Sequence, residues 1–289
     1  MLSAVMVIRP HTAMAAELSE IRDRGYLIVA VKDNQPPLGF IDSAGNLNGF
    51  EIEIAQRLAE VLLGDPSAIQ LVPTSNIDRL NAVVDDRVDV AIAGITLTEP
   101  RRRIVTFSDP YYLDGATFIT NQSAIQQLRD LRLSKIAILD QSSTVAHVRY
   151  ILPAAQLIGV GSYAEGRDLL DNGSVDAFAG DASVLSGWSL SGWRTNDTET
   201  ETIAASTPSE RRPYHLLPHI ISAEPLSIAM PKGTRFDPLR TSINQAIRQW
   251  YTEGWLQESA TTWGLPAESS PQFLELRLLD PRPATSEPQ

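Results

Sequence analysis

The chain has 289 residues, a formal net charge of −11 and no cysteine. Its length fits one large domain or two of moderate size, and its composition is that of a globular protein with a full hydrophobic core. The negative charge argues against nucleic-acid binding, and the lack of cysteine excludes disulfides, thiolate catalysis and cysteine-ligated metals. Anionic ligands remain compatible with this charge, because a small site can carry a local positive field.

Residues 1–16 have features of an export-signal remnant. A short apolar run precedes Ala13-Met14-Ala15, an A-x-A pattern that a signal peptidase could cut before Ala16. The positively charged segment that usually opens such a signal is missing, and Arg9-Pro10-His11 interrupts the apolar run. A disordered leader is the alternative. No later stretch approaches the length of about 18 apolar residues that a membrane-spanning helix needs.

The first half of the chain alternates strand and helix signals. Apolar β-rich runs alternate with segments whose apolar residues have helical spacing, and the first of these helices stops at Gly64. This alternation predicts an α/β unit with a parallel sheet. The predicted order is strand, helix, strand, helix, strand, over residues 26–31, 50–64, 69–74, 77–87 and 88–95.

A second set of elements repeats this order, so we expect two similar α/β halves rather than one continuous sheet. Residues 195–212 are polar and lack periodicity, which is typical of an exposed loop or insertion. A strand and turn at 226–233 and a helical stretch at 236–264 follow, and 266–289 read as a flexible tail. The second set covers residues 135–140, 143–152, 156–162, 163–173 and 175–181.

The common catalytic and nucleotide-binding motifs are missing from the sequence. There is no G-x-S-x-G, H-E-x-x-H, G-x-x-x-x-G-K-[ST] or G-x-G-x-x-G pattern. His215 and His219 form the one close histidine pair, but Pro218 lies between them and no carboxylate falls within the pair. A loop pair is therefore favoured over a metal site. We predict no metal, no cofactor and no catalytic residue.

The stretch GITLTEPRRR, from Gly94 to Arg103, follows a predicted strand. Open α/β sheets place ligands beyond the carboxyl ends of their strands, where Gly94 allows close backbone approach and Thr96 offers a hydroxyl. An arginine in the first turn of a helix opposes the helix dipole, so Arg101 makes sense there if it meets an anion. Its guanidinium fork matches a carboxylate. We interpret Arg102 and Arg103 as solvated surface charges.

Four segments of the sequence form a recognisable set in chain order: KDNQPPLGFIDSAGNLNGFEIEIAQRLAEVL, DRVDVAIAGITLTEPRRRIVTFSDPYY, GSVDAFAGD and EPLSIAMPKG. Together they resemble the polar amino-acid family of periplasmic solute-binding proteins, which serve ABC importers. The resemblance runs approximately from Leu18 to Trp263, and the segment ending FSDPYY is the most specific.

The resemblance implies the type II periplasmic-binding-protein fold, in which two α/β lobes close around a ligand like a clamp. It also implies a monomer that carries a free amino acid to a membrane permease. The expected limits are 17–110 and 228–265 for lobe one, 116–221 for lobe two, and 111–115 and 222–227 for the hinge.

The resemblance also assigns the ligand's main-chain groups to residues. Arg101, Thr96 and Ser143 match the family positions that bind the carboxylate, and Asp181 with Gly94 match those that hold the ammonium. Gln141 stands where the family usually has glycine. For Ser143 and for Asp181 the alternative is a helix N-cap without a ligand role.

The side-chain pocket is expected at Lys32, Gln35, Asn76 and Arg79. Lys32 replaces the aspartate of relatives that bind basic or amide side chains, and it would attract a carboxylate. Arg79 aligns with an arginine common among glutamate-binding members, while Gln35 replaces an aromatic residue of many relatives. The ligand expected first is glutamate, then glutamine or aspartate. Exposed surface charges are the alternative for Lys32 and Arg79.

Three other functions are alternatives to amino-acid transport. A dehydratase of the same fold would need a general acid or base in the cleft, yet no histidine lies near the expected ligand contacts and Glu99 is the only acid beside Arg101. A sensor module would need a signalling segment or a partner protein. A dinucleotide-dependent enzyme would need the missing glycine fingerprint. We therefore predict a binding protein and not an enzyme.

Overall fold

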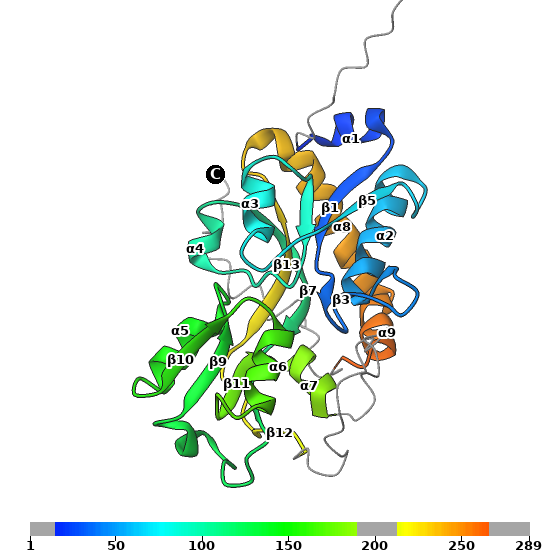
Figure 1. The fold of residues 1–289 in the computed structure, drawn as a ribbon. Coiled ribbons are helices and arrows are strands. Elements are labelled where there is room, and N and C mark those ends of the chain that lie inside the picture. The colour runs from blue at the N-terminus through cyan, green and yellow to red at the C-terminus, as the bar shows by residue number, and fades with distance from the viewer. Residues whose placement is uncertain (1–14, 190–212, 266–289) are drawn as a thin grey trace, which may run out of the picture.

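The computed structural model describes residues 15–189 and 213–265 (Figure 1). The predicted insertion at 195–212 and the predicted tail at 266–289 lie outside the described residues. So does the predicted export-signal remnant, apart from Ala15 and Ala16. These three predictions stay untested.

Two five-stranded sheets form the two halves of the molecule (Figure 1). The first sheet has the strand order β5-β1-β6-β13-β7, and the second has β10-β9-β11-β8-β12. In each sheet the first three strands are parallel and the next two are antiparallel to their neighbours. The two-lobed α/β prediction is confirmed, although the sheets are mixed rather than purely parallel.

The strands of the first sheet are β1 (Leu27–Val31), β5 (Ile69–Pro73), β6 (Val90–Ile92), β7 (Thr106–Asp114) and β13 (Glu224–Met230). Those of the second are β8 (Ala116–Thr120), β9 (Lys135–Leu139), β10 (Gln156–Val160), β11 (Ala177–Asp181) and β12 (His215–Leu216). The predicted strands correspond to β1, β5, β6, β9, β10, β11 and β13. β7, β8 and β12 were not predicted, because they lie outside the alternating pattern and connect the halves.

The α-helices pack on the two halves of the molecule. Helix α8, gold in Figure 1, belongs to the first half, where it packs against β7 and α2. Helices α1 to α4 cover Leu18–Arg24, Phe50–Leu63, Arg79–Val84 and Glu99–Arg102. Helices α5 to α9 cover Thr144–Ile151, Tyr163–Asp171, Ala182–Ser189, Asp237–Thr252 and Trp255–Thr262. Short 3-10 helices cover Leu128–Leu131 and Thr234–Phe236.

Helix α2 shows how the local sequence produces the core of the first half. Its apolar residues recur at helical spacing, so Ile54 and Leu58 are fully buried, and Gly64 ends the helix with a φ of 82°. Phe50 packs against Tyr112 of β7 with ring centroids 5.9 Å apart. Each such buried side chain contributes about 1.5–3 kcal/mol to the free energy of unfolding.

Three local features differ from the sequence-based prediction. The helical stretch predicted at 236–264 is two helices, because Gly254 adopts a φ of 78° between α8 and α9. The predicted turn region after β1 contains a small sheet, and helix α1 precedes β1 without having been predicted. The small sheet comprises β2 (Asn34–Gln35), β3 (Gly39–Ile41) and β4 (Leu47–Asn48).

The chain crosses between the two sheets at two adjacent places. It passes from β7 to β8 at Gly115 and returns before β13, where Glu224 pairs with Asp114. The amide of Ile221 donates to the carbonyl of Ala116 at 2.8 Å just before the return. Both crossings fall within or beside the segments predicted as a hinge. Movement about them, and the lobe limits, stay predictions.

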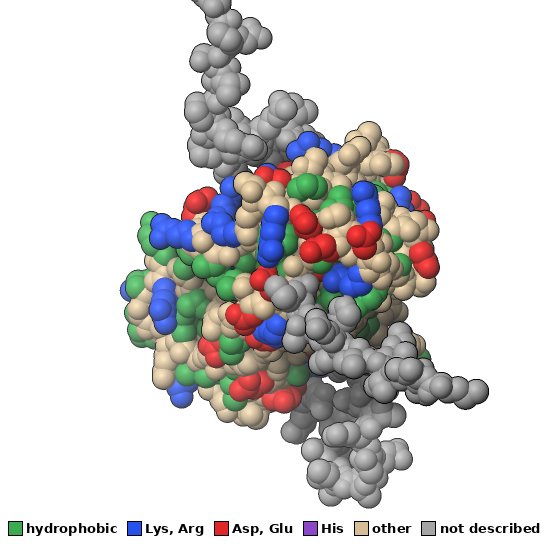
Figure 2. All heavy atoms as spheres, turned by 90° about the horizontal axis from the view of Figure 1, so that it is seen from above, with side chains coloured by type: hydrophobic (Ala, Val, Ile, Leu, Met, Phe, Trp, Pro, Cys, Tyr) green, Lys and Arg blue, Asp and Glu red, His purple; other side chains and the backbone are tan. Residues whose placement is uncertain are grey.

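The surface carries charges of both signs. Figure 2 shows Lys and Arg side chains interleaved with Asp and Glu on the face seen from above, without a large basic patch there. Among residues 15–189 and 213–265, no helix is long and apolar enough to cross a membrane.

Candidate functional site

The predicted site residues gather where the two halves meet. Gly94 and Thr96 follow β6 of the first half, and Asp181 ends β11 of the second. Four hydrogen bonds join a residue of the first half to a residue of the second. The surfaces of the two halves that face each other, here called the two walls, are therefore in contact. The four hydrogen bonds join Gln35 and Asp181 at 3.2 Å, Arg101 and Gln141 at 3.0 Å, Thr96 and Ser143 at 3.1 Å, and Asn76 and Asp140.

Arg101 is positioned by the short helix α4. Thr98 caps this helix by accepting from the amide of Arg101 at 3.4 Å, and the Arg101 Nη1 donates to the carbonyl of Thr96 at 2.9 Å. Burial lowers the pKa of the Arg101 guanidinium, and the carboxylates of Glu224 and Asp181 oppose this effect. Arg101 is thus a half-buried cation at the junction of the halves, whereas Arg102 is exposed, as predicted.

Ser143 faces the first half and does not cap its helix. No side-chain cap bond forms at the start of α5, so the N-cap alternative for Ser143 is wrong. Its Oγ donates to Glu224 Oε2 at 2.7 Å and lies 3.1 Å from Thr96 Oγ1. Because a hydroxyl has one proton, Thr96 is then the donor to Ser143.

Glu224 is an acid that the sequence-based reasoning missed. It is buried, and its Oε1 lies 3.4 Å from Nε2 of His147. The expectation that no histidine lies near the site was therefore wrong. Glu99, expected as the acid beside Arg101, has an 84% exposed side chain and instead approaches Arg102. Sequence adjacency misled here, because Glu224 is far from Arg101 along the chain.

Asp181 forms the acidic part of the site. Tyr163 donates its hydroxyl proton to Asp181 Oδ2 at 2.8 Å, and Gln35 Nε2 donates to the same oxygen at 3.2 Å. Burial raises the pKa of Asp181, while the Tyr163 hydrogen bond and the cations Arg79 and Arg101 oppose the rise. The carboxylate faces the first half and is held by partners outside α7, beyond what a simple N-cap requires.

Gly94 provides a backbone turn that a larger residue could not adopt easily. Its φ is 61°, and an added Cβ would lie 3.1 Å from Nε2 of Gln35 and 3.4 Å from Nη1 of Arg79. Its amide donates to Glu51 Oε1 at 2.7 Å, and its carbonyl accepts from Arg79 at 2.6 Å. Both backbone groups of Gly94 therefore have partners within the protein.

Lys32 and Arg79 are buried cations, so the surface-charge alternative is wrong for both; they are 3% and 4% exposed. Lys32 Nζ donates to the carbonyl of Thr74 at 3.2 Å, and burial together with Arg79 lowers the pKa of Lys32 to about 8. Arg79 Nη1 donates to the carbonyl of Ala93 at 2.6 Å. Burial together with Arg101 lowers the pKa of Arg79 to about 10.

Glu51 is a second acid that was missed. It is fully buried on α2, its Oε1 accepts from Tyr111 and from Gly94, and burial raises its pKa. Its position carried a signal, because Ala55, Leu58 and Leu62 follow it at helical spacing and are buried. A glutamate on the apolar stripe of a helix marks a buried charge.

Several buried polar atoms of this region have no hydrogen-bond partner within the described protein, among them Oε1 of Gln35, Oε2 of Glu51, Oδ1 of Asn76 and Nε of Arg79. The amide orientations follow from the network, because Gln35 Nε2 donates to a carboxylate and Asn76 Nδ2 donates to a carbonyl. Buried polar groups without partners are costly, and they indicate where a ligand or water would bind.

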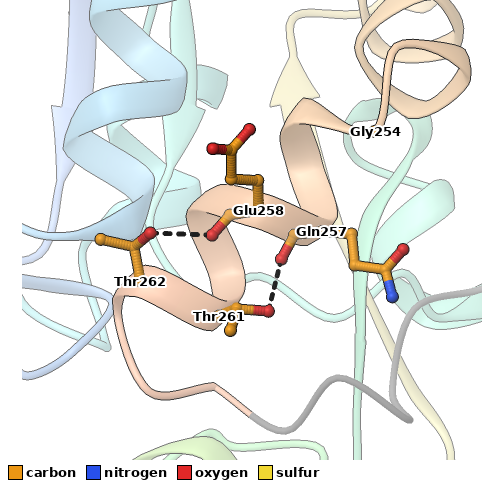
Figure 3. Close-up of a pocket in the computed structure, with 5 residues that line it drawn as sticks. All are labelled: Gly254, Gln257, Glu258, Thr261 and Thr262. Atoms are coloured by element: carbon orange, nitrogen blue, oxygen red, sulfur yellow. Dashed lines mark hydrogen bonds between the residues drawn. The ribbon is translucent and has the colours of Figure 1, made fainter.

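Two hollows on the surface differ in their relation to this site. One, of about 510 Å³, lies between the turn at Thr98–Pro100 and residues 140–149 of the second half, beside Ser143. The other, of about 420 Å³, lies on α9 (Figure 3). There Thr261 and Thr262 donate to carbonyls of their own helix. It shares no residue with the candidate site and suggests no chemistry.

Comparisons with known proteins agree with this architecture. A glutamine-binding protein of Geobacillus stearothermophilus is 29% identical over 221 residues, covering 75% of this chain and 77% of its own. A cyclohexadienyl dehydratase of Pseudomonas aeruginosa is 34% identical over 136 residues, covering 47% and 48%. A solved structure described as an ancestral arginine-binding protein bound to glutamine superposes with a TM-score of 0.70 at 27% identity, covering 83% of this chain and 98% of its own.

A family model also matches most of the chain. Residues 27–266 match the model of the bacterial extracellular solute-binding proteins, family 3, which includes both sheets and every residue of the candidate site. The fold is the two-lobed type II fold expected from the sequence. The chain belongs to the bacterial extracellular solute-binding proteins of family 3.

Proposed function

We propose that the protein captures a polar amino acid between its lobes in the periplasm and delivers it, as a monomer, to the membrane permease of an ABC importer. The observation that carries this proposal is a pair of opposite charges, one on each side of the junction. Arg101 of lobe one and Asp181 of lobe two both point to the junction, where they suit the carboxylate and the ammonium of one zwitterion.

Binding would proceed by lobe closure rather than chemistry. Arg101, Thr96 and Ser143 would hold the ligand carboxylate, and Asp181 with the Gly94 carbonyl would hold the ammonium. A ligand that contacts both walls binds the closed form better than the open form, and so shifts the equilibrium between them. Burial of both ligand charges in the closed cleft would strengthen each contact, since the local dielectric falls.

The unpartnered atoms near Gly94 favour a carboxamide side chain. Gln35 and Glu51 each offer an acceptor there, and Arg79 offers a donor. A carboxamide has both donors and an acceptor, so it can satisfy all three. A carboxylate would leave the acceptors unpaired, and a guanidinium would face Arg79 and Lys32. This reasoning puts glutamine ahead of glutamate, the ligand expected first from the sequence.

The test is calorimetry of the purified full chain against glutamine, glutamate, asparagine, aspartate, arginine and cystine, after unfolding and refolding to remove bound ligand. We expect glutamine to bind most tightly and glutamate next. Binding of arginine alone would exclude the carboxamide pocket but leave the two-walled clamp intact. Binding of none of the six would count against the amino-acid proposal itself.

A dehydratase is the second candidate, because Asp181 is a half-buried acid with a raised pKa and a dehydratase is among the relatives. A proton donor near the cleft is what elimination of water requires. Incubation with cyclohexadienyl acids, followed by chromatography of the products, separates the two functions. Turnover of a cyclohexadienyl acid that Asp181→Asn abolishes would support the enzyme. Binding of an amino acid without turnover of any cyclohexadienyl acid would support the transport protein.

A further inference from the structure

A buried carboxylate far from the cleft binds the first described residues of the chain. Asp89 is fully buried; its Oδ1 accepts from the amide of Ala16 at 2.9 Å and its Oδ2 accepts from the amide of Ile28 at 2.8 Å. Arg24 of α1 forms an ion pair with the same carboxylate, and its side chain is 20% exposed. Asp89 therefore joins the N-terminal segment, α1 and β1.

Ala15 and Ala16 already belong to the folded body. They are 4% and 6% exposed, and the amide of Ala15 donates to the carbonyl of Asp86 at 2.7 Å. In the sequence, Ala15 is the last residue of the A-x-A pattern. The peptide bond that a signal peptidase would hydrolyse is thus the bond whose nitrogen atom donates to Asp89.

We propose that Asp89 is the binding site for the α-ammonium group of Ala16, which is created when a signal peptidase hydrolyses the peptide bond between Ala15 and Ala16. Hydrolysis consumes one water and breaks the C–N bond. The carbonyl carbon of Ala15 leaves as a carboxylate on the released segment, and the nitrogen of Ala16 takes up a proton to become an ammonium group.

The site is suited to this change in charge. The neutral amide of the uncut chain already makes one hydrogen bond to the Asp89 carboxylate. An ammonium group at the same position adds a positive charge and converts this hydrogen bond into an ion pair. Asp89 is fully buried, whereas Arg24 is partly solvated, so Arg24 compensates the charge of Asp89 only in part. The ammonium group of Ala16 would be the second cation that binds this carboxylate. Burial of an isolated ammonium would be costly, and Asp89 removes that cost.

The first experiment identifies the cleaved bond. The leader upstream of Ala13 is replaced by the charged and apolar segments of a functional export signal, and the protein is purified from the periplasm for intact-mass measurement. We expect the chain to begin at Ala16, and Ala15→Tyr to block cleavage. A chain that begins at another residue, or that stays uncut, overturns the proposal.

The second experiment tests whether Asp89 binds the charge. A chain that starts at Ala16 is compared with its N-acetylated form, because the acetyl group supplies the carbonyl that Ala15 supplies in the uncut chain. We expect acetylation to lower the folding equilibrium constant in urea about tenfold. Asp89→Asn should remove this difference; if that variant does not fold, Arg24→Gln should retain or enlarge it.

Equal stability of the free and acetylated chains, or a difference that Asp89→Asn does not alter, would overturn the proposal. Neither experiment involves the amino-acid ligand. The inference shares with the proposed function the premise of export to the periplasm, but it is independent of the ligand. Failure of the stability experiment therefore leaves the proposed function untouched, and failure of amino-acid binding leaves this inference untouched.

Discussion

The two sheets share one strand order but place different charged residues at their shared junction. β1 and β6 of the first sheet occupy the same places as β9 and β11 of the second. After β1 comes the buried cation Lys32, whereas β11 ends in the half-buried carboxyl group of Asp181. Topology alone therefore brings strand ends together, and the residues placed on those ends decide what binds. One cationic wall and one anionic wall suit a ligand with both charges.

The largest expected effect comes from the cationic wall. Arg101→Ala should weaken amino-acid binding at least about 100-fold, because it removes a charge-assisted contact in a desolvated cleft. The fold should survive, since the guanidinium bonds only to two backbone carbonyls. Calorimetry measures the loss, and Arg102→Ala, an exposed neighbour, is the control. Equal affinity of the two variants would remove Arg101 from the site.

The anionic wall is tested by Asp181→Asn, which should weaken amino acids about 10- to 100-fold. The same ligand without its ammonium should lose little, because Asp181 would contact only that group. Competition experiments with glutamine and its deaminated analogue measure both losses. If the two ligands lose affinity equally, Asp181 acts through the structure of the Tyr163 and Gln35 network rather than through the ammonium.

The side-chain pocket is tested by Glu51→Gln. This change replaces the unpartnered Oε2 with a nitrogen donor and can keep the Oε1 that accepts from Gly94 and Tyr111. We expect selectivity to move about tenfold from glutamine toward glutamate. Calorimetry with both ligands measures the ratio, and Glu60→Gln, an exposed site on the same helix, is the control. An unchanged ratio would place Glu51 outside the pocket.

The hinge region offers a pH test. Burial, followed by Asp181, raises the pKa of Asp114 from an ordinary 3.8 to about 7. Between about pH 4 and pH 7 the folded protein keeps a proton on Asp114 that the unfolded chain loses. The contribution of Asp114 to the free energy of unfolding is therefore complete below about pH 4 and falls as pH rises through about 7.

Unfolding releases about one proton from Asp114 in this pH range, and this proton makes the free energy of unfolding fall as pH rises. Asp114→Asn should remove this proton and so reduce the slope of the free energy of unfolding against pH. Asparagine can mimic the protonated acid, since it keeps one acceptor for the amide of Gly115 and offers one donor. Urea unfolding at a series of pH values measures the slope, with exposed Asp168→Asn as control. The same slope in Asp114→Asn and the unaltered chain would contradict the assignment.

Much of the fold could be predicted because its signals are local. Spacing of apolar residues identified α2, and Gly64 identified its end. The partners that complete the site could not be predicted in this way. Glu224 reaches Ser143 from 81 positions along the chain, and no periodicity reports such a contact. Glu51 could have been identified from the sequence, because a charged residue is unexpected on the buried apolar stripe of α2.

The smallest expected effect concerns the loop of lobe two at Gln141, where the resemblance led us to expect glycine. Gln141 adopts a φ of 58°, a conformation that costs a non-glycine residue about 1–2 kcal/mol. Gln141→Gly should therefore raise the free energy of unfolding by about 1 kcal/mol. Asp86→Gly is the control, since Asp86 has a φ of 56° and lies outside the site, although its gain should be smaller because aspartate tolerates this conformation better than glutamine.

Both changes should stabilise the protein in urea, but only Gln141→Gly should alter ligand affinity. The carbonyl of Gln141 accepts from Arg101 Nη2 across the two walls, so a more mobile backbone there loosens a contact of the closed form. If affinity stays the same in both variants, the loop of lobe two closes on Arg101 without influencing the ligand, and the anionic wall is then defined by Asp181 and its partners alone.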